Sequence, residues 1–302
     1  MLISSVVAAM LALSPESFQS SSAALPPVEL GDVVVSGKGL RDEVQSFVDE
    51  VAAPPPKRGL ARWRGSLCVS TVNIDREIAQ PLIDHIATIA DSHGVRPSRS
   101  LNCRPNVVIM FTDDGRALAS ALVENQPAIF NIRWTRQVDR GRRALQAFQD
   151  EDAPVRWWHL SMPVIGLTGE RAIRMPGDTG VILVRGEGIV NRGRPVSDDL
   201  MKVVIVVDLS KTGAVSLPDL GDYLAMISLA QIDPDGETAA FDTVLNLFDG
   251  SGRSRHLSGW DQAYLTSLYG AYYERINPYD QASSMTRGIR RQLGPPGPAD
   301  DQ

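Results

Sequence analysis

The chain has 302 residues, of which 43% are hydrophobic and 22% are charged, and its formal net charge at pH 7 is -6. This composition is typical of a globular protein, and the negative charge argues against a dedicated nucleic-acid-binding protein, which would be basic. The length is sufficient for one large domain or two smaller ones.

The N-terminal segment has the pattern of a secretion signal. Residues 2–13 form an uncharged apolar run that is too short to span a bilayer as a helix, and the motif Ser22-Ala23-Ala24 suits signal cleavage. No Lys or Arg precedes the run, and a buried N-terminal helix is the alternative. Because Pro15 and a serine-rich stretch favour a cleavage region, we expect residues 1–24 to be a signal peptide. The mature protein is then periplasmic or secreted, without an integral membrane segment.

The next segment, residues 25–59, is predicted to be an extended leader. It contains a short strand at residues 32–36, a short helix at 40–51 and a triple proline at 54–56 that favours an extended spacer. We expect one α+β domain over residues 60–275. The remainder, residues 276–302, is polar and proline-rich, which predicts a partly disordered tail.

Hydrophobic periodicity predicts the elements of this domain. Apolar runs predict strands at residues 67–74, 106–112, 155–164, 179–185 and 201–208. Periodic apolar positions predict helices at residues 81–93, beginning with Pro81 in the first turn, at about 113–122 and at 260–273. We therefore predict a mixed sheet packed against helices.

Residues 217–232 form the most apolar helix in the prediction. Apolar side chains cover most of its faces, so it should be buried in the middle of the core. Ser216 and Asp219 have the spacing of a capping box at its start. We expect this helix to offer no reactive group to solvent. A polar cleft beside Asp222, Tyr223 and Met226 would contradict that expectation.

The cysteines, Cys68 and Cys103, each lie beside a predicted strand. If these strands are neighbours, the cysteines can form a disulfide in an oxidising compartment, closing a loop of roughly 35 residues. Two buried free thiols are the alternative. We expect the disulfide on the condition that the chain is exported.

A surface insertion is expected at residues 131–152. It has five arginines between positions 133 and 143, of which Arg133, Arg136 and Arg140 are candidate contacts for an anionic polymer of the cell envelope. The alternative is a solvated helix face. Nearby, strand alternation should place one ring of the pair Trp157-Trp158 inside and the other outside. Trp158 and the adjacent His159 are therefore further candidate ligand contacts.

Catalytic and metal-binding motifs are missing from the sequence. The four histidines include no pair at i and i+4, and no GxSxG motif is present. The pair Asp113-Asp114 and the strand-ending Asp208 could hold a hard cation, although capping of a helix explains them more simply. The run around Gly37 and Gly39 imitates a dinucleotide motif, but Asp42 replaces the third glycine. We expect no cofactor and no metal.

Several segments, at residues 62–68, 103–109, 155–159, 219–233, 245–248 and 257–265, resemble an uncharacterised group of exported proteins from Gram-negative bacteria. The order of elements is also similar to the zincin-like domain of metallopeptidases, in which an active-site helix carries HExxH. The corresponding helix here has no histidine, so the resemblance implies a degenerate, metal-free domain.

These observations predict a non-catalytic binding protein of the envelope, with an envelope protein or an anionic polymer as partner. A hydrolase related to zinc peptidases, working without the usual metal box, is the alternative. A periplasmic small-ligand binder would need an apolar pocket, which a sequence does not reveal.

Overall fold

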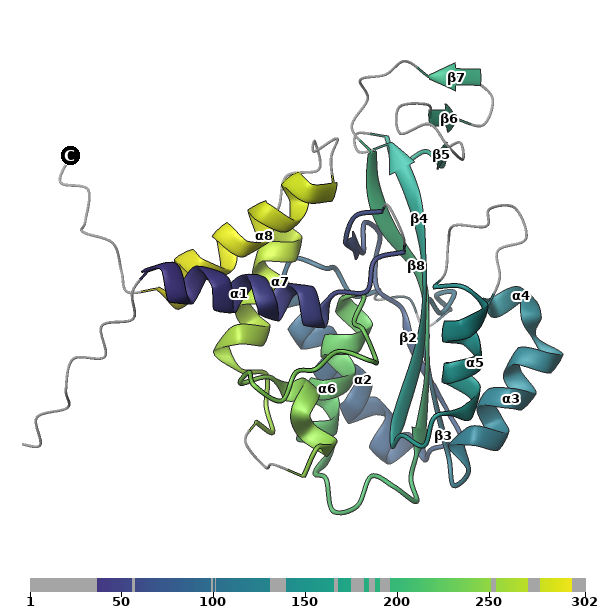
Figure 1. The fold of residues 1–302 in the computed structure, drawn as a ribbon. Coiled ribbons are helices and arrows are strands. Elements are labelled where there is room, and N and C mark those ends of the chain that lie inside the picture. Colours follow the sequence, from purple (N-terminus) through teal and green to yellow (C-terminus); the bar gives the residue numbers. More distant parts are fainter. Residues whose placement is uncertain are drawn as a thin grey trace, which may run out of the picture. The chain divides into compact units, whose positions relative to one another are not determined.

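A mixed sheet of five strands forms the centre of the fold (Figure 1). Strands β1 (Ala61–Arg62), β2 (Val69–Val72), β3 (Val107–Thr112) and β8 (Val196–Asp208) are parallel, and β4 (Val155–Ile165) runs antiparallel to β8. The order across the sheet is β4-β8-β3-β2, and β1 pairs with the first half of β8. The expected α+β class is confirmed.

The computed structural model describes residues 37–55, 58–98, 100, 102–130, 140–165, 168–174, 182–184, 188–190, 196–250, 254–270 and 278–294. The described residues from Gly37 to Gly294 belong to one compact unit. The expected signal peptide and the strand at residues 32–36 lie outside the described residues.

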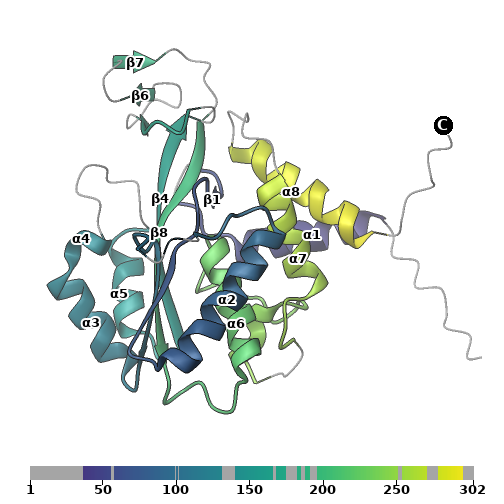
Figure 2. The same cartoon turned by 180° about the vertical axis from the view of Figure 1, so that it is seen from behind.

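Helices cover both faces of the sheet, as the two opposite views show (Figures 1 and 2). One face packs against α1 (Gly37–Val51), α2 (Arg76–Ser92), α6 (Leu217–Leu229), α7 (Gly259–Gly270) and α8 (Pro278–Leu293), together with the 3-10 helix η1 (Val244–Phe248). The other face packs against α3 (Gly115–Asn125), α4 (Pro127–Phe130) and α5 (Arg142–Asp150). Alternation along β8 sends Val203, Ile205 and Val207 to the first face and Val204 and Val206 to the second, so the whole run is apolar.

The central helix is confirmed. Eleven of the thirteen residues of α6, all those from Asp219 to Leu229, are buried. The Ser216 side chain caps its start by accepting a hydrogen bond from the Asp219 N–H. The helix ends at Leu229, three residues earlier than expected, where Ala230 adopts an extended backbone.

The expected domain limits, residues 60 and 275, are too narrow. The leader helix, α1, is present as predicted, but its residues Val44 and Phe47 are fully buried. In the expected tail, residues 278–293 form α8, whose Met285 and Ile289 are also fully buried. The two helices contact each other, and α8 also packs on α7, so both complete the core.

The insertion and the second helix also differ from expectation. Residues 142–150 form α5, which lies on the sheet and buries Phe148, so this part is core and not a surface insertion. Helix α2 begins at Arg76, and Pro81 lies inside it. The apolar stripe of Ala79 and Leu82 spans the proline, and its packing offsets the one lost backbone hydrogen bond.

The strands β4 and β8 extend beyond the rest of the sheet as a long antiparallel pair (Figure 1). A small antiparallel sheet, β5 (Ala172–Arg174), β6 (Ile182–Val184) and β7 (Gly188–Val190), lies between them in the sequence. Of the strand expected at residues 179–185, residues 182–184 are described as β6.

The disulfide between Cys68 and Cys103 is confirmed. Strands β2 and β3 are parallel neighbours, and the Cys68 N–H donates to the side-chain oxygen of Asn106 just before β3. The two Cα atoms lie 6.2 Å apart, within the ordinary range for such a bond.

Candidate functional site

The carboxyl ends of β2, β3 and β8 meet at one edge of the sheet. From this edge, β3 continues into α3 on one face, whereas β8 continues into α6 on the opposite face. Ligands of open sheets bind where neighbouring strands send their connections to opposite faces, because a crevice opens there. The topology therefore points to this edge.

An open groove lies at this edge, with a volume of about 670 Å³. Small-molecule sites commonly measure about 300–1,000 Å³. Among the described residues, seven apolar and three polar or charged side chains line the groove: Ile74, Ile78, Phe111, Leu209, Val215, Leu217 and Leu220, with Asn73, Asp75 and Thr212. The lining comes from the ends of three strands and the starts of two helices.

Exposed apolar side chains gather around the groove. Among the described residues, the large apolar side chains that face solvent are Val72, Ile78, Met201 and Leu209. Ile78 is 42% exposed and Leu209 is 44% exposed, and both line the groove. Val72 directly precedes the lining residue Asn73. Clustered apolar exposure marks a binding surface more often than isolated apolar residues do.

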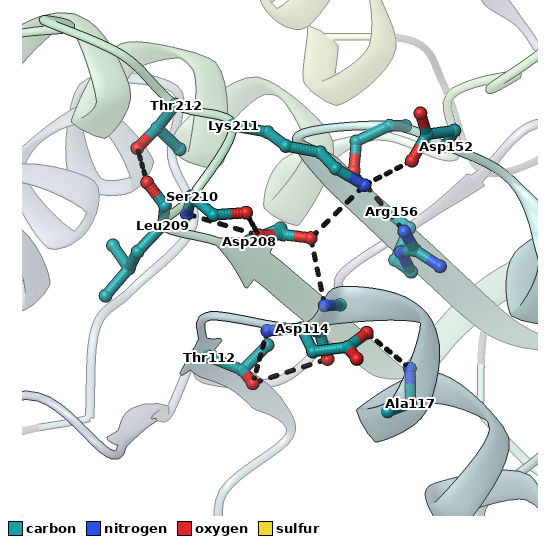
Figure 3. Close-up of polar contacts among 12 residues, drawn as sticks. Thr112, Asp114, Ala117, Asp152, Arg156, Asp208, Leu209, Ser210, Lys211 and Thr212 are labelled. Carbon is teal, nitrogen blue, oxygen red and sulfur yellow. Dashed lines mark hydrogen bonds and ion pairs between the residues drawn. The ribbon is translucent and has the colours of Figure 1, made fainter.

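A polar network holds the turn that follows β8 (Figure 3). The buried Asp208 carboxylate accepts hydrogen bonds from the Gly115 N–H (2.9 Å) and the Ser210 hydroxyl (2.6 Å), and Lys211 Nζ lies 3.4 Å away. Burial disfavours ionisation, but these donors outweigh it and lower the pKa of Asp208. Lys211 also pairs with Asp152, whose pKa it lowers.

Residues of this turn belong either to the network or to the lining of the groove. Asp208, Ser210 and Lys211 belong to the network, whereas Leu209 and Thr212 line the groove. The network therefore positions the groove wall.

The acidic residues at this edge act as caps and anchors. Asp114 caps α3 by accepting a hydrogen bond from the Ala117 N–H at 2.9 Å, which confirms the capping interpretation for this residue. Thr112 Oγ1 accepts from the Asp114 N–H at 3.1 Å (Figure 3). Within the described ranges, no three histidine, cysteine or acidic side chains are grouped so that they could hold a metal ion.

A second polar cluster lies between α2 and α6. His85 Nε2 lies 2.6 Å from Asp222 Oδ1, and the His85 side chain is 38% exposed. The second Asp222 oxygen accepts a hydrogen bond from the Leu257 N–H, and His256 Nδ1 lies 3.2 Å from Asp219 Oδ1. Our expectation for α6 is right for the buried Tyr223 but wrong for Asp222, which contacts a partly exposed imidazole.

This cluster has little signature in the sequence. Its two main members, His85 and Asp222, are 137 positions apart. The available signal is local: Asp219 and Asp222 are three residues apart on one helix face, and Gly221 lies between them. A Cβ atom at position 221 would lie 2.6 Å from His85 Cδ2, so glycine permits the contact.

The predicted tryptophan contact is wrong. Trp158 is only 4% exposed and Trp157 only 8%, because helices cover both faces of the sheet. Trp157 Nε1 donates to the Ile232 carbonyl at 3.0 Å, and Trp158 Nε1 donates to the Phe130 carbonyl at 3.3 Å. The two rings do lie on opposite faces of the sheet, as alternation predicts, but neither ring faces solvent.

His159 is also a core residue. Burial lowers its pKa to about 4, so the ring is neutral near pH 7. We assign the proton to Nε2, which lies 2.7 Å from the Ile227 carbonyl oxygen and donates to it.

The arginines divide into two groups. Arg133 and Arg136 lie outside the described residues. Arg140 pairs with Asp233 at 2.7 Å and with Asp235 at 3.2 Å, so its charge is neutralised by the loop that follows α6.

The structure does bring Arg140, Trp158 and His159 together, around a cavity of about 20 Å³. A single water needs roughly 10–15 Å³ measured in this way. The space is therefore too small for a ligand.

Within the described part of the chain, no helix is long and apolar enough to cross a membrane. No protein-family model, curated protein or solved structure shows a significant match to the chain. The arguments for function therefore come from the geometry of the groove and of the two polar clusters.

Proposed function

We propose that the chain is an exported, non-catalytic binding protein of the cell envelope, periplasmic or secreted, and that it binds a small ligand with an apolar body in the groove at the carboxyl edge of the sheet. The observation that carries the proposal is the groove itself, about 670 Å³ in volume and lined mainly by apolar side chains. The disulfide supports export, because such bonds persist in oxidising compartments.

The apolar lining supplies the driving force for binding. Ile78 and Leu209 are each nearly half exposed in the free protein, so a ligand can remove the rest of their surface from water. Covering half of such a side chain contributes about 1 kcal/mol, which corresponds to about fivefold in affinity.

Binding of an uncharged apolar dye, Nile red, tests the proposal. We expect the wild-type protein to bind the dye with enhanced fluorescence, and Ile78→Ser and Leu209→Ser each to weaken binding about fivefold. Both side chains are exposed, so the substitutions should leave the fold intact.

Met201→Ser provides the matched control for this experiment, because Met201 is 37% exposed but does not line the groove. Its affinity should equal that of the wild type. A wild-type protein that does not bind the dye, or a control that loses as much affinity as the groove variants, would contradict the proposal.

A hydrolase is the second candidate, because the His85–Asp222 pair favours it. A carboxylate that holds an imidazole can orient it and stabilise its protonated form, as a general base requires. Hydrolysis of a panel of peptide and ester substrates by the wild type, lost in Asp222→Asn, would support this candidate. A wild type without activity above background would remove it.

We further propose that the domain is a degenerate relative of the zincin-like domain, on the basis of its order of elements. Metal analysis of the purified protein tests this relation: stoichiometric zinc would contradict a metal-free domain and favour the hydrolase. Binding of an anionic envelope polymer through Arg133 and Arg136 stays a prediction. Arg140 does not support it, because Asp233 and Asp235 already neutralise this side chain.

A further inference from the structure

Of the described residues that line the groove, one carries a charge, Asp75. Asp75 precedes the first residue of α2 and is exposed, and its carboxylate makes no capping hydrogen bond to the helix. Within the described part of the chain, no ion pair neutralises it. A negative charge is therefore available to a ligand in this mainly apolar groove.

The surrounding segments add to this negative charge. Residues 73–78, 112–116 and 208–212, which follow the three strands, contain five carboxylates and three basic side chains: Asp75, Glu77, Asp113, Asp114 and Asp208 against Arg76, Arg116 and Lys211. Asp208 and Lys211 pair with each other in the network, where Lys211 also pairs with Asp152, and this leaves four carboxylates against two basic side chains. The excess of carboxylates favours a cationic ligand.

The start of α2 has the opposite electrostatic effect on the ligand, because a helix N-terminus attracts anions. Its effect equals roughly half a positive charge, whereas the Asp75 carboxylate carries a full negative charge at the same place. The carboxylate therefore outweighs the helix, and the local preference is for a cation.

The lining combines polar side chains near Asp75 with apolar surface from the segment that follows β8. Asn73, which has a positive φ of 60°, lies two residues from Asp75 and offers its amide as a hydrogen-bond partner. Leu209, Leu217 and Leu220 follow β8 and supply apolar surface. This arrangement matches a ligand with a charged head and an apolar body.

We infer that the groove binds a cationic amphiphile, an alkyl chain or similar apolar body that carries an ammonium group, with the ammonium group at Asp75. The inference rests on the proposed function, and it adds the chemical class of the ligand.

Competition by three ligands of equal chain length tests the inference. Octylamine, octanol and octanoate are titrated against bound Nile red at pH 7 and low ionic strength. We expect octylamine to bind most tightly and octanoate most weakly, with about a tenfold difference, since one exposed charge pair is attractive and the other repulsive. Raising the salt concentration should reduce this difference.

Substitution of Asp75 isolates its role. Asp75→Asn keeps a good capping residue, so the fold should persist, while octylamine loses its advantage over octanol. Asp75→Ser is a second variant that also caps well. Asp91→Asn is the matched control, because Asp91 is exposed near the far end of α2, and it should behave as the wild type.

The outcomes separate the two proposals. If none of the three ligands displaces the dye and the dye itself does not bind, the proposed function fails. If octanol binds but octanoate equals or exceeds octylamine, groove binding stands and the inference is wrong. An octylamine preference that survives in both Asp75 variants would also overturn it.

Discussion

Gly221 decides whether the imidazole of α2 can reach the carboxylate of α6. The His85 ring occupies the space that a side chain at position 221 would need, since a Cβ atom there would lie 2.6 Å from His85 Cδ2. His85 is partly exposed, so its ring could move into solvent if that space were filled. The contact with Asp222 would then be lost, whereas the backbone of both helices would stay in place.

A double-mutant experiment measures this coupling. Alanine is favoured over glycine inside a helix by about 1 kcal/mol, so an unopposed Gly221→Ala change should stabilise the protein. In the wild-type background we expect Gly221→Ala to lower the free energy of unfolding by about 1 kcal/mol. The cost of losing the His85–Asp222 contact and displacing the ring should exceed the gain in helix propensity. In a His85→Ala background the same change should be stabilising. Urea denaturation of the wild type, Gly221→Ala, His85→Ala and the double variant gives the effect of Gly221→Ala on stability in each background. Equal effects in the two backgrounds would refute the coupling.

His159 makes stability depend on pH in a defined window. Its pKa is about 4 in the folded protein against 6.5 in the unfolded chain, because burial disfavours the charged ring. Between these two pKa values the unfolded state binds a proton that the folded state does not bind. The contribution of His159 to the free energy of unfolding is therefore fully present above pH 6.5 and decreases as the pH falls from 6.5 to 4. The loss from this group is about 3 kcal/mol at pH 4.

Comparison with His159→Gln isolates this contribution, since glutamine keeps a hydrogen-bond donor and does not titrate. The difference in unfolding free energy between the wild type and the variant, measured in urea at several pH values, should decrease by about 3 kcal/mol from pH 7 to pH 4. A constant difference would show that His159 titrates normally in the folded protein.

At the scale of elements, the turn between β8 and α6 connects the polar network to the groove. Asp208 is almost fully buried and accepts from Gly115 and Ser210, so it ties this turn to the start of α3. Asp152, the other partner of Lys211, is 75% exposed in its side chain. Buried charge-assisted hydrogen bonds contribute about 1.5–3 kcal/mol, whereas exposed ion pairs contribute less than about 1 kcal/mol.

These magnitudes predict different results for two similar substitutions. Asp208→Asn should lower the free energy of unfolding by about 2 kcal/mol and weaken dye binding in the groove, because Leu209 and Thr212 belong to the loosened turn. Asp152→Asn removes a carboxylate from the same lysine, but because this carboxylate is exposed the change should lower stability much less and leave dye binding unchanged. Equal losses of stability in the two variants would contradict the assigned role of Asp208.

At the scale of the whole molecule, the sequence predicts well what lies in the centre of the sheet. Strand β8 and helix α6 are apolar over long runs because nearly all of their surface is buried, and β3 is buried on one face and partly buried on the other. Such apolar runs can be recognised in the sequence alone. Predictions that depend on what covers a surface are less successful. Trp158 was expected outside because alternation alone does not reveal that α3, α4 and α5 cover its face. The groove combines residues from position 73 to position 220, and no local pattern joins them.

The disulfide acts on the molecule as a whole, because it constrains the unfolded chain and also joins β2 to the segment before β3. Its loop spans 35 positions, for which chain entropy predicts about 3–4 kcal/mol of stabilisation. We expect reduction, or the double variant Cys68→Ser/Cys103→Ser, to lower the free energy of unfolding by that amount. The reductant should not affect the double variant, which serves as its control.

Because β2 leads directly into Asn73 and Asp75, loss of the disulfide should also weaken dye binding in the groove. Mass spectrometry after alkylation checks the starting state: exported protein with two alkylatable thiols would refute both the bridge and its contribution to stability.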